Sequence, residues 1–442
     1  MATGQELPVH PVPDSLNAPP AATYRTLRGL ERDEFRPTRP LRHAVNAMFW
    51  APRTAVDLVL AGAGVSAVLI DENRIISKFE DIFYIYDRKL GWFPIFNVVT
   101  GFPRGYGLSV FYKDNYYQSY IRGAYSNSEI WGAKAKAEWT LFLWKRVWQI
   151  EMSGRLQNDN NYRFYGIGAD PTADARSHFR PGQTPLEYGI YQQRHIILEG
   201  HLGIRPTPDL EIFIATQWLE RTISNPAGGG ERTLSNVFDT DRLPGYLFEP
   251  KKWYTELALR VDTRDNLDRI VPGFRSEAYT GVGIGRNEDP SNLFRGGVDA
   301  AWFIPVLRRN RLLIPRLVFD MTEPLNDAPI PFTEYPRPVA FRGVHRKELL
   351  RNDRYALVSS IAYQWPLTHN LDGHLFFDHV TVGRTPGRMT MSEMPWAVGL
   401  GADIHTRYAE LARVYIAYGS EGIFARGTIG LSSMFKDRSD WH

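Results

Sequence analysis

From about residue 91 onward, apolar and polar residues alternate with a period of two. In "WGAKAKAEWTL", residues 131–141, Trp and Ala occupy one face, while Lys134, Lys136 and Glu138 occupy the other. The same strict alternation recurs in "VWQIEMSGRLQ", "RHIILEGHLGIR", "LEIFIATQWLER", "LRVDTRDN", "YALVSSIAYQW" and "WAVGLGADIH". Strands of soluble sandwiches commonly have about five or six residues, whereas longer alternating segments with aromatic residues near their ends are typical of transmembrane β-barrels.

The number and spacing of these segments predict the fold. We count about fifteen or sixteen between residues 91 and 435, and since bacterial single-chain barrels normally have even strand numbers, we predict sixteen. The predicted fold class is all-β: a transmembrane antiparallel β-barrel with alternating long and short connections. Arg260 and Asp262 would then face a polar lumen, while Leu257 and Leu259 face lipid. A large soluble β protein is the alternative that strand length disfavours.

The chain before the barrel has a different pattern. Residues 1–40 are Pro-rich and polar, so we expect a disordered linker there. Residues 41–90 contain good helix formers after Pro52 and no sustained alternation, which predicts an N-terminal helical segment. This segment could plug the lumen, lie on the membrane or cap the periplasmic mouth, and the sequence leaves all three open. The barrel is expected over 91–435, followed by a short tail, 436–442.

Composition narrows the function classes. With 52 basic and 49 acidic residues the net charge is +3, which does not resemble the one-sided basic surface of a nucleic-acid binder. The 442-residue chain has no cysteine, which suits an oxidising compartment. The N-terminus has no signal-peptide pattern, so an exported form would have lost that signal or would start upstream.

Motifs for catalysis or metal binding are not evident in this sequence. It has no H-E-x-x-H pair, and no motif singles out a nucleophilic Ser, so we predict no enzyme, no metal site and no cofactor. The glycines of "GVGIGRNED", at 281, 283 and 285, fall on one face of a predicted strand. We interpret them as making room for a lumen plug rather than as a phosphate-binding turn.

Four stretches, taken in order, resemble the bacterial surface-antigen superfamily of outer-membrane assembly and translocation barrels, the BamA/TamA type. They are "FYGIGAD", with Tyr165, Gly166, Gly168 and Asp170; "DTRDNLDRIVPG", with Asp262, Arg264, Asp265, Asn266 and Gly273; "AFRGVHRKELLRND", with Arg342 and Gly343; and "GTIGLSSMF", whose Phe435 ends a C-terminal strand signal. "FFDHV" is similar to a fifth element, F-x-D-x-G, with Val380 in place of the Gly. Together these stretches span about 270 residues.

The resemblance implies a long loop folded into the lumen and locked there by a pair between Arg342 and Asp378. A guanidinium pairs with a carboxylate in a bidentate manner better than any other cation does. Three positions depart from the family pattern: Ala169 replaces Asn, Val344 replaces an aromatic residue, and seven residues follow Phe435. No pattern of the periplasmic modules (POTRA) precedes the barrel, so the resemblance is to a subgroup that lacks them.

The implied function is insertion or translocation of proteins, or of lipids, at the bacterial outer membrane, gated by the loop. The seam between the first and last strands would be the weak point, because its edges must pair to close the barrel. Outer-membrane lipid, client polypeptides or lipids, and a periplasmic partner of the N-terminal segment are the expected partners. The alternative is a passive porin or a structural anchor for a periplasmic partner.

Overall fold

The structure is a computed structural model and describes residues 84–85, 89–95, 105–182, 188–228, 230–264, 271–306, 308–336, 340–343, 348–349, 352–367, 371–389, 395–405, 410–420 and 422–429. The strands are β1 (Tyr84–Ile85), β2 (Leu90–Ile95), β3 (Tyr106–Lys113), β4 (Tyr117–Asn127), β5 (Ile130–Leu143), β6 (Arg146–Phe164), β7 (Gly189–Thr207), β8 (Leu210–Ser224), β9 (Lys251–Asp262), β10 (Gly273–Gly285), β11 (Leu293–Val306), β12 (Arg308–Pro324), β13 (Glu348–Leu349), β14 (Tyr355–Pro366), β15 (Leu371–Gly383), β16 (Trp396–His405), β17 (Glu410–Gly419) and β18 (Gly422–Ile429). The short helices are η1 (Ala175–Ser177), η3 (Gly230–Arg232), α4 (Leu234–Val237), η4 (Phe332–Glu334) and η5 (Pro386–Arg388).

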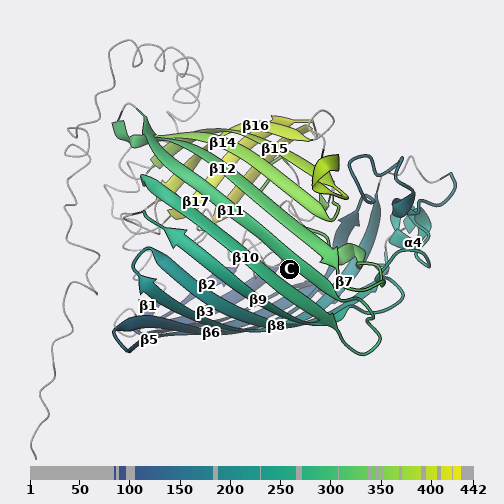
Figure 1. The fold of residues 1–442 in the computed structure, drawn as a ribbon, viewed down its shortest axis with the longest axis horizontal. Helices are drawn as coiled ribbons and strands as arrows, with labels where there is room; N and C mark the ends of the chain where they lie inside the picture. Colours follow the sequence, from purple (N-terminus) through teal and green to yellow (C-terminus); the bar gives the residue numbers. More distant parts are fainter. Residues whose placement is uncertain are drawn as a thin grey trace, which may run out of the picture.

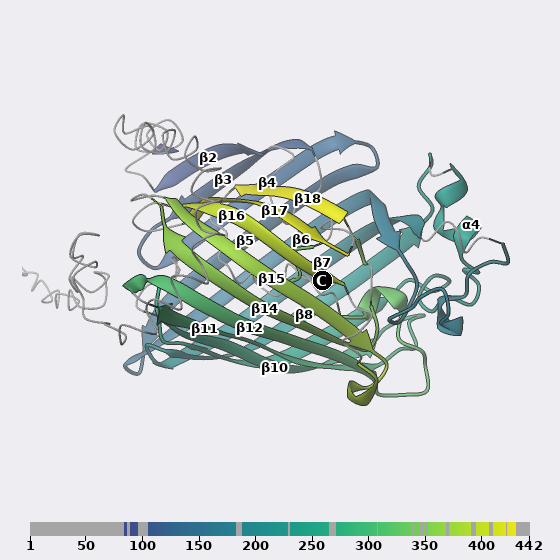
Figure 2. The same ribbon diagram turned by 90° about the horizontal axis from the view of Figure 1, so that it is seen from above.

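Sixteen of these strands form one antiparallel meander. Consecutive strands pair from β2 to β12, β12 then pairs with β14, and the pairing continues to β18. The tilted strands curl into a barrel (Figures 1 and 2). The prediction of an all-β antiparallel barrel with sixteen strands is therefore confirmed, and β2 and β18 are the two ends of the meander.

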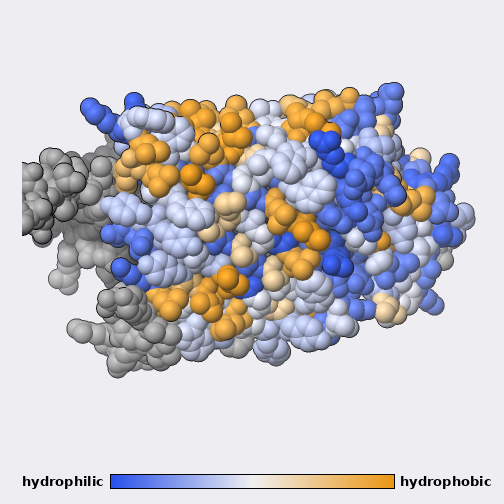
Figure 3. Space-filling view, turned by 90° about the horizontal axis from the view of Figure 1, so that it is seen from below, coloured by the Kyte–Doolittle hydropathy of each residue, from blue (hydrophilic) through white to orange (hydrophobic). Residues whose placement is uncertain are grey.

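The two faces of the wall differ in chemistry as the alternation predicts. On β9, Lys252, Glu256 and Ala258 are buried, while Trp253 and Leu257 lie on the outer surface. Figure 3 shows one face of the molecule, where hydrophobic residues cover much of the middle and the loop-bearing end is mostly hydrophilic. The apolar side of each strand therefore faces outward, toward lipid in a transmembrane barrel, and the charged side faces the lumen.

The two ends of the barrel differ in the length of their connections. At one end, called the turn end here, Trp144 and Lys145 alone join β5 to β6, and both have positive φ angles of 51° and 58°. At the other end, called the loop end, residues 165–188, 225–250 and 325–354 form long connections. This loop end carries α4 and lies on the right in Figure 1.

Most of the chain before the barrel lies outside the described residues. This applies to the predicted linker, 1–40, to most of the predicted helical segment, 41–90, and to the predicted tail, 436–442. For the part of this segment that the structure describes, the helical prediction is wrong, because residues 84–85 form β1 and residue 90 begins β2. Aromatic and β-branched residues dominate "IFYIY", residues 82–86, and favour a strand. None of the helices in the described part of the chain is long and apolar enough to cross a membrane.

Candidate functional site in the barrel lumen

The connection between β12 and β14, residues 325–354, is called the lumen loop, and Arg342 lies against the inner wall. Its Nε donates to Asp378 Oδ2 at 2.7 Å, and its Nη2 donates to Oδ1 at 2.6 Å. The backbone N–H of Arg342 also donates to Oδ2, at 3.0 Å. Asp378 is fully buried on β15. The carboxylate therefore binds both the side chain and the backbone of the loop.

Neighbouring wall residues fix this contact further. Ser360 of β14 accepts from Arg342 Nη2 at 2.9 Å and donates to Asp378 Oδ1 at 2.7 Å. The guanidinium also lies 3.6 Å from the ring centroid of Phe376, a cation–π geometry. Phe341 packs with wall residues of β12, β14, β15 and β16. We call Arg342, Asp378 and Ser360 the first anchor; its role as a lock stays a prediction.

Gly343 follows Arg342 at a point of close approach. A Cβ there would lie 2.7 Å from Ala397 Cβ of β16 and 2.6 Å from the Phe341 ring. Real Cβ atoms essentially never come this close to another heavy atom, so any larger residue would push the loop away from the wall. The Arg-Gly pair thus combines a charged contact with the absence of a side chain.

The "FYGIGAD" stretch builds the connection between β6 and β7 at the loop end. Gly166 and Gly168 have φ angles of 98° and 92°, a region that favours glycine. Tyr165 packs on Tyr188 with ring centroids 5.1 Å apart. The Asp170 carboxylate accepts from Thr172 Oγ1 at 2.7 Å and so forms a local turn. These four residues shape a loop and do not contact the first anchor in the described structure.

Arg176 joins this connection to the end of the lumen loop. Its Nη1 and Nη2 donate to Asp353 Oδ1 and Oδ2 at 2.9 and 2.7 Å, and its Nη2 also donates to Asp174 at 2.6 Å. These contacts raise the pKa of Arg176. Burial alone would raise the pKa of Asp174, but the hydrogen bonds from Arg176 lower it. The Gly168 N–H donates to the Asn352 carbonyl at 2.9 Å, which adds a backbone link.

The lumen loop also adds a short strand to the wall. β6 continues to Phe164, six residues beyond Asn158, which is the last β6 residue to pair with β5, opposite Trp131. β13 pairs in parallel with this extension, Glu348 opposite Arg163 and Leu349 opposite Phe164. The loop therefore uses backbone pairing, as well as side chains, to hold its returning limb at the loop end.

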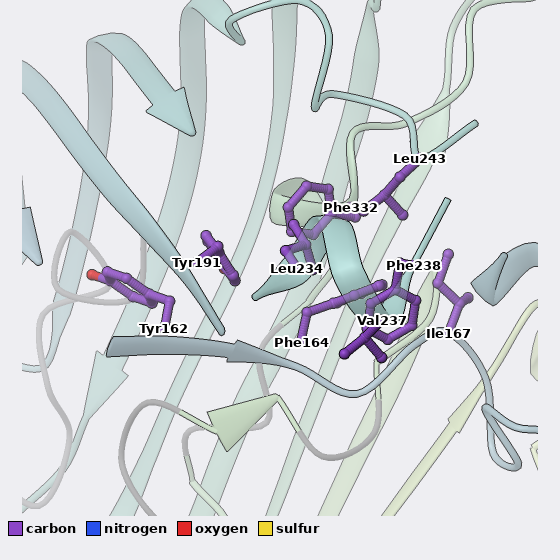
Figure 4. Packing of buried hydrophobic residues seen from close by; sticks show 9 residues of the cluster. All are labelled: Tyr162, Phe164, Ile167, Tyr191, Leu234, Val237, Phe238, Leu243 and Phe332. Atoms are coloured by element: carbon purple, nitrogen blue, oxygen red, sulfur yellow. The ribbon is translucent and has the colours of Figure 1, made fainter. Parts of the chain in front are cut away.

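An apolar cluster, called the aromatic cap, packs the long connections together at the loop end. Phe332 of the lumen loop packs on Phe164 of β6 and Tyr191 of β7, with ring centroids 4.9 and 5.4 Å apart. Phe164 also packs on Phe238, at 4.9 Å. The cap comprises Tyr162, Phe164, Ile167, Tyr191, Leu234, Val237, Phe238, Leu243 and Phe332 (Figure 4). It draws its members from β6, β7, α4 and the connections that follow β6, β8 and β12.

Glu334, two residues after Phe332, forms a charged cluster that sequence reasoning missed. One carboxylate oxygen accepts from Arg221 of β8 and the other from Arg295 of β11. Arg221 and Glu334 are each only 1% exposed. The alternation placed Arg221 on the lumen face, but no sequence signal pairs residues 113 positions apart. Glu334 stands as a lone acid in the Pro-rich stretch "APIPFTEYPRP".

The "DTRDN" stretch lies at the turn end, at the end of β9. Arg264 Nη2 donates to Asp262 Oδ2 at 2.7 Å, and its guanidinium lies 5.0 Å from the Phe303 ring centroid. Gly273, with φ of 149°, leaves no room for a Cβ beside Arg264. This group closes the turn into β10 and does not contact the first anchor in the described structure.

Three predicted site residues, Asp265, Asn266 and Phe435, lie outside the described residues. Within the described ranges, no group of three or more His, Cys, Asp or Glu side chains could hold a metal ion. The charged groups of the lumen form ion pairs with one another, as Arg316 does with Asp299 at 2.7 Å and Arg413 with Asp403 at 2.6 Å. Such an interior is suited to holding a polar loop in place.

Comparison with known proteins supports the fold. No protein-family model matches the sequence, and no curated protein matches it either. The structure is similar to BamA from Haemophilus ducreyi lacking POTRA domains 1–3, with 10% identity, a TM-score of 0.51, and 74% of this chain and 68% of that chain covered. CdiB from Acinetobacter baumannii gives 8% identity, a TM-score of 0.44, and coverage of 73% and 55%. The similarity to BamA shows that the chain shares the fold of that barrel.

Proposed function

We propose that this protein is an integral barrel of the bacterial outer membrane that inserts or translocates proteins, or lipids, and is gated by its lumen loop. The observation that carries the proposal is the buried contact of Arg342 with Asp378 and Ser360. A loop bound to the inner wall by side chain and backbone together would narrow the lumen, which supports a gated barrel over a passive pore. The sequence resemblance and the BamA fold support the same function.

The aromatic cap supports a closed mouth at the loop end. Phe332 lies in a cluster with residues of β6, β7 and α4, all at most 8% exposed. Moving the lumen loop out would therefore break the first anchor and would also expose apolar surface to water. That exposure costs about 25 cal/mol of free energy for each Å². Such a cost favours clients that use the seam between β2 and β18 over clients that pass through the loop end. The client class is a polypeptide or a lipid, with outer-membrane lipid surrounding the barrel.

Single-channel conductance in a planar bilayer tests the gate. The unmodified refolded chain is expected to show low, flickering conductance, and a deletion of residues 326–352 is expected to show large, steady conductance. A large and steady conductance that the deletion leaves unchanged would mean an open pore and would overturn the gating proposal. Migration of the unheated protein in SDS gels checks that both forms are folded barrels.

The seam is tested separately from the gate. Because the chain has no native cysteine, two introduced cysteines can join β2 to β18 with a single disulfide. Under the proposal, the oxidised barrel loses insertion of a β-barrel client into liposomes, and reduction restores it. Full insertion by the oxidised form would contradict a seam-based mechanism.

A further inference from the structure

We propose that the lumen loop has a second anchor, made by Glu334, Arg221 and Arg295, which keeps the loop end closed without help from Arg342. The role of the second anchor in gating rests on the proposed function, because this anchor would regulate the same loop. The contacts themselves stand apart from that function. The second anchor predicts that breaking the first anchor alone leaves the upstream half of the loop in place.

The wall binds this part of the loop through both side chain and backbone. Besides the Glu334 carboxylate, Arg221 Nη1 donates to the Thr333 carbonyl at 3.0 Å, and Arg295 Nη2 donates to the Glu334 carbonyl at 3.2 Å. Thr322 Oγ1 of β12 donates to the same carbonyl, at 3.3 Å. Three wall strands therefore hold two consecutive loop residues.

Burial makes this anchor costly to open. Arg295 is 7% exposed and the other two members are each 1% exposed. Removing one partner of a buried charge cluster leaves an uncompensated charge, which is strongly destabilising. The loop can therefore leave only if all three charged groups gain water together. That requirement makes the second anchor an all-or-none contact.

The glycines of "GVGIG" belong to the support of this anchor. The Arg295 guanidinium lies 5.5 Å from the Tyr254 ring centroid, and the Tyr254 hydroxyl donates to Glu256 at 2.7 Å. A Cβ at Gly281 would collide with that hydroxyl, and one at Gly283 would collide with Leu293. Within the described residues, wall side chains occupy the space that a Cβ at Gly281 or Gly283 would need; that the glycines make room for a lumen plug stays a prediction. The glycine stripe lets the Tyr254 ring lie beneath Arg295.

The two anchors use different strands of the wall. Glu334 is bound by β8 and β11, which β9 and β10 separate, whereas Arg342 is bound by β14 and β15. Only seven residues, 335–341, lie between Glu334 and Arg342 in the sequence. The two anchors share no wall partner, so the loss of the Arg342 contacts leaves the contacts of Glu334 with Arg221 and Arg295 in place.

Thr333 offers a probe for the second anchor alone. Thr333 is 2% exposed, and its hydroxyl makes no hydrogen bond among the described residues. Thr333→Cys places the only thiol of the chain beneath the anchor. In the refolded barrel, a membrane-impermeant maleimide should label this cysteine slowly. Labelling should stay slow after Arg342→Ala and become fast after Glu334→Gln.

Control variants separate the second anchor from general loosening. Arg316→Gln breaks a pair between two wall strands and should leave Thr333→Cys protected, and SDS-gel migration excludes variants that fail to fold. In the double variant Glu334→Gln with Arg221→Gln, Thr333→Cys should be labelled fast. This double variant should fold better than the variant with Glu334→Gln alone. Fast labelling after Arg342→Ala alone, or protection after Glu334→Gln, would overturn the inference. The labelling experiment does not depend on conductance or client insertion. The second anchor can therefore be disproved while the proposed function stands, and the proposed function can be disproved while the second anchor stands.

Discussion

The two anchors hold one loop by different chemistry. The first anchor brings a cation on the loop to a carboxylate in the wall, with Asp378 fully buried and Arg342 partly exposed. The second anchor reverses the signs, because the carboxylate is on the loop and two arginines lie in the wall. Loss of the Glu334 charge would remove this carboxylate from two buried arginines at once. The contact that carries a recognisable motif is therefore not the more deeply buried of the two.

The largest effect is expected when both anchors are broken. Glu334→Gln combined with Arg342→Ala should give the large, steady single-channel conductance of the 326–352 deletion. Arg342→Ala alone should stay low and flickering, because the second anchor still holds the loop. Conductance recorded for the four chains, under the same salt and voltage, measures this.

The single and double variants separate the contributions of the two anchors to conductance. If Arg342→Ala alone already matched the deletion, the first anchor would be the whole gate and the second anchor would have no role in conductance. If the double variant stayed closed, the aromatic cap would be sufficient without either anchor. Arg316→Gln is the matched control, since it removes an arginine from a lumen ion pair that does not include the loop.

A smaller effect is expected on stability. Asp378→Ala leaves the Arg342 guanidinium near the inner wall without its carboxylate, so the free energy of unfolding should fall by about 3–5 kcal/mol. Asp378→Ala with Arg342→Ala should cost less, because no unpaired charge remains. Urea titration of the barrel in lipid vesicles measures both values. A double variant less stable than Asp378→Ala would contradict this account.

The sequence predicted the wall well because the wall depends on local information. Strand positions and lumen-facing residues such as Arg260 and Arg221 follow from a period of two, and each strand carries its own signal. The contact between Arg342 and Asp378 was expected only through a resemblance to known motifs. Glu334 was missed because its partners lie on β8 and β11, and only the barrel's curvature brings these strands to the same loop residue.

The N-terminal segment was predicted less well for a related reason. Residues 41–90 lack alternation, which led to the helical prediction, yet 84–85 form β1 against β2. Two residues of strand are too short for a period to be visible, and their pairing depends on the neighbouring strand. Propensity within "IFYIY" was the usable local signal.

A third prediction concerns the support of the second anchor. Gly281→Ala should displace Tyr254 from beneath Arg295 and lower the free energy of unfolding by about 1–3 kcal/mol, the usual cost of overpacking. It should also speed labelling of Thr333→Cys. Gly200→Ala is the matched control, because its Cβ would meet only Thr216 at 3.7 Å, an ordinary contact. Equal effects of the two substitutions would show that Tyr254 does not support the anchor.

The smallest effect is expected from pH, through Tyr335, the residue after Glu334. Burial, together with the charge of Asp353, raises the pKa of Tyr335 to about 12 from its ordinary value of 10.0. The closed loop therefore favours the neutral hydroxyl, and this contribution is complete below pH 10 and lost as the pH rises toward 12. The open fraction of single-channel recordings should increase over this range in the unmodified chain and increase less in Tyr335→Phe. Since Tyr335 adjoins the second anchor, Arg342→Ala should make the increase of the open fraction with pH steeper and should not abolish it. If the open fraction of the unmodified chain and of Tyr335→Phe followed the same curve against pH, the alkaline sensitivity would come from another group.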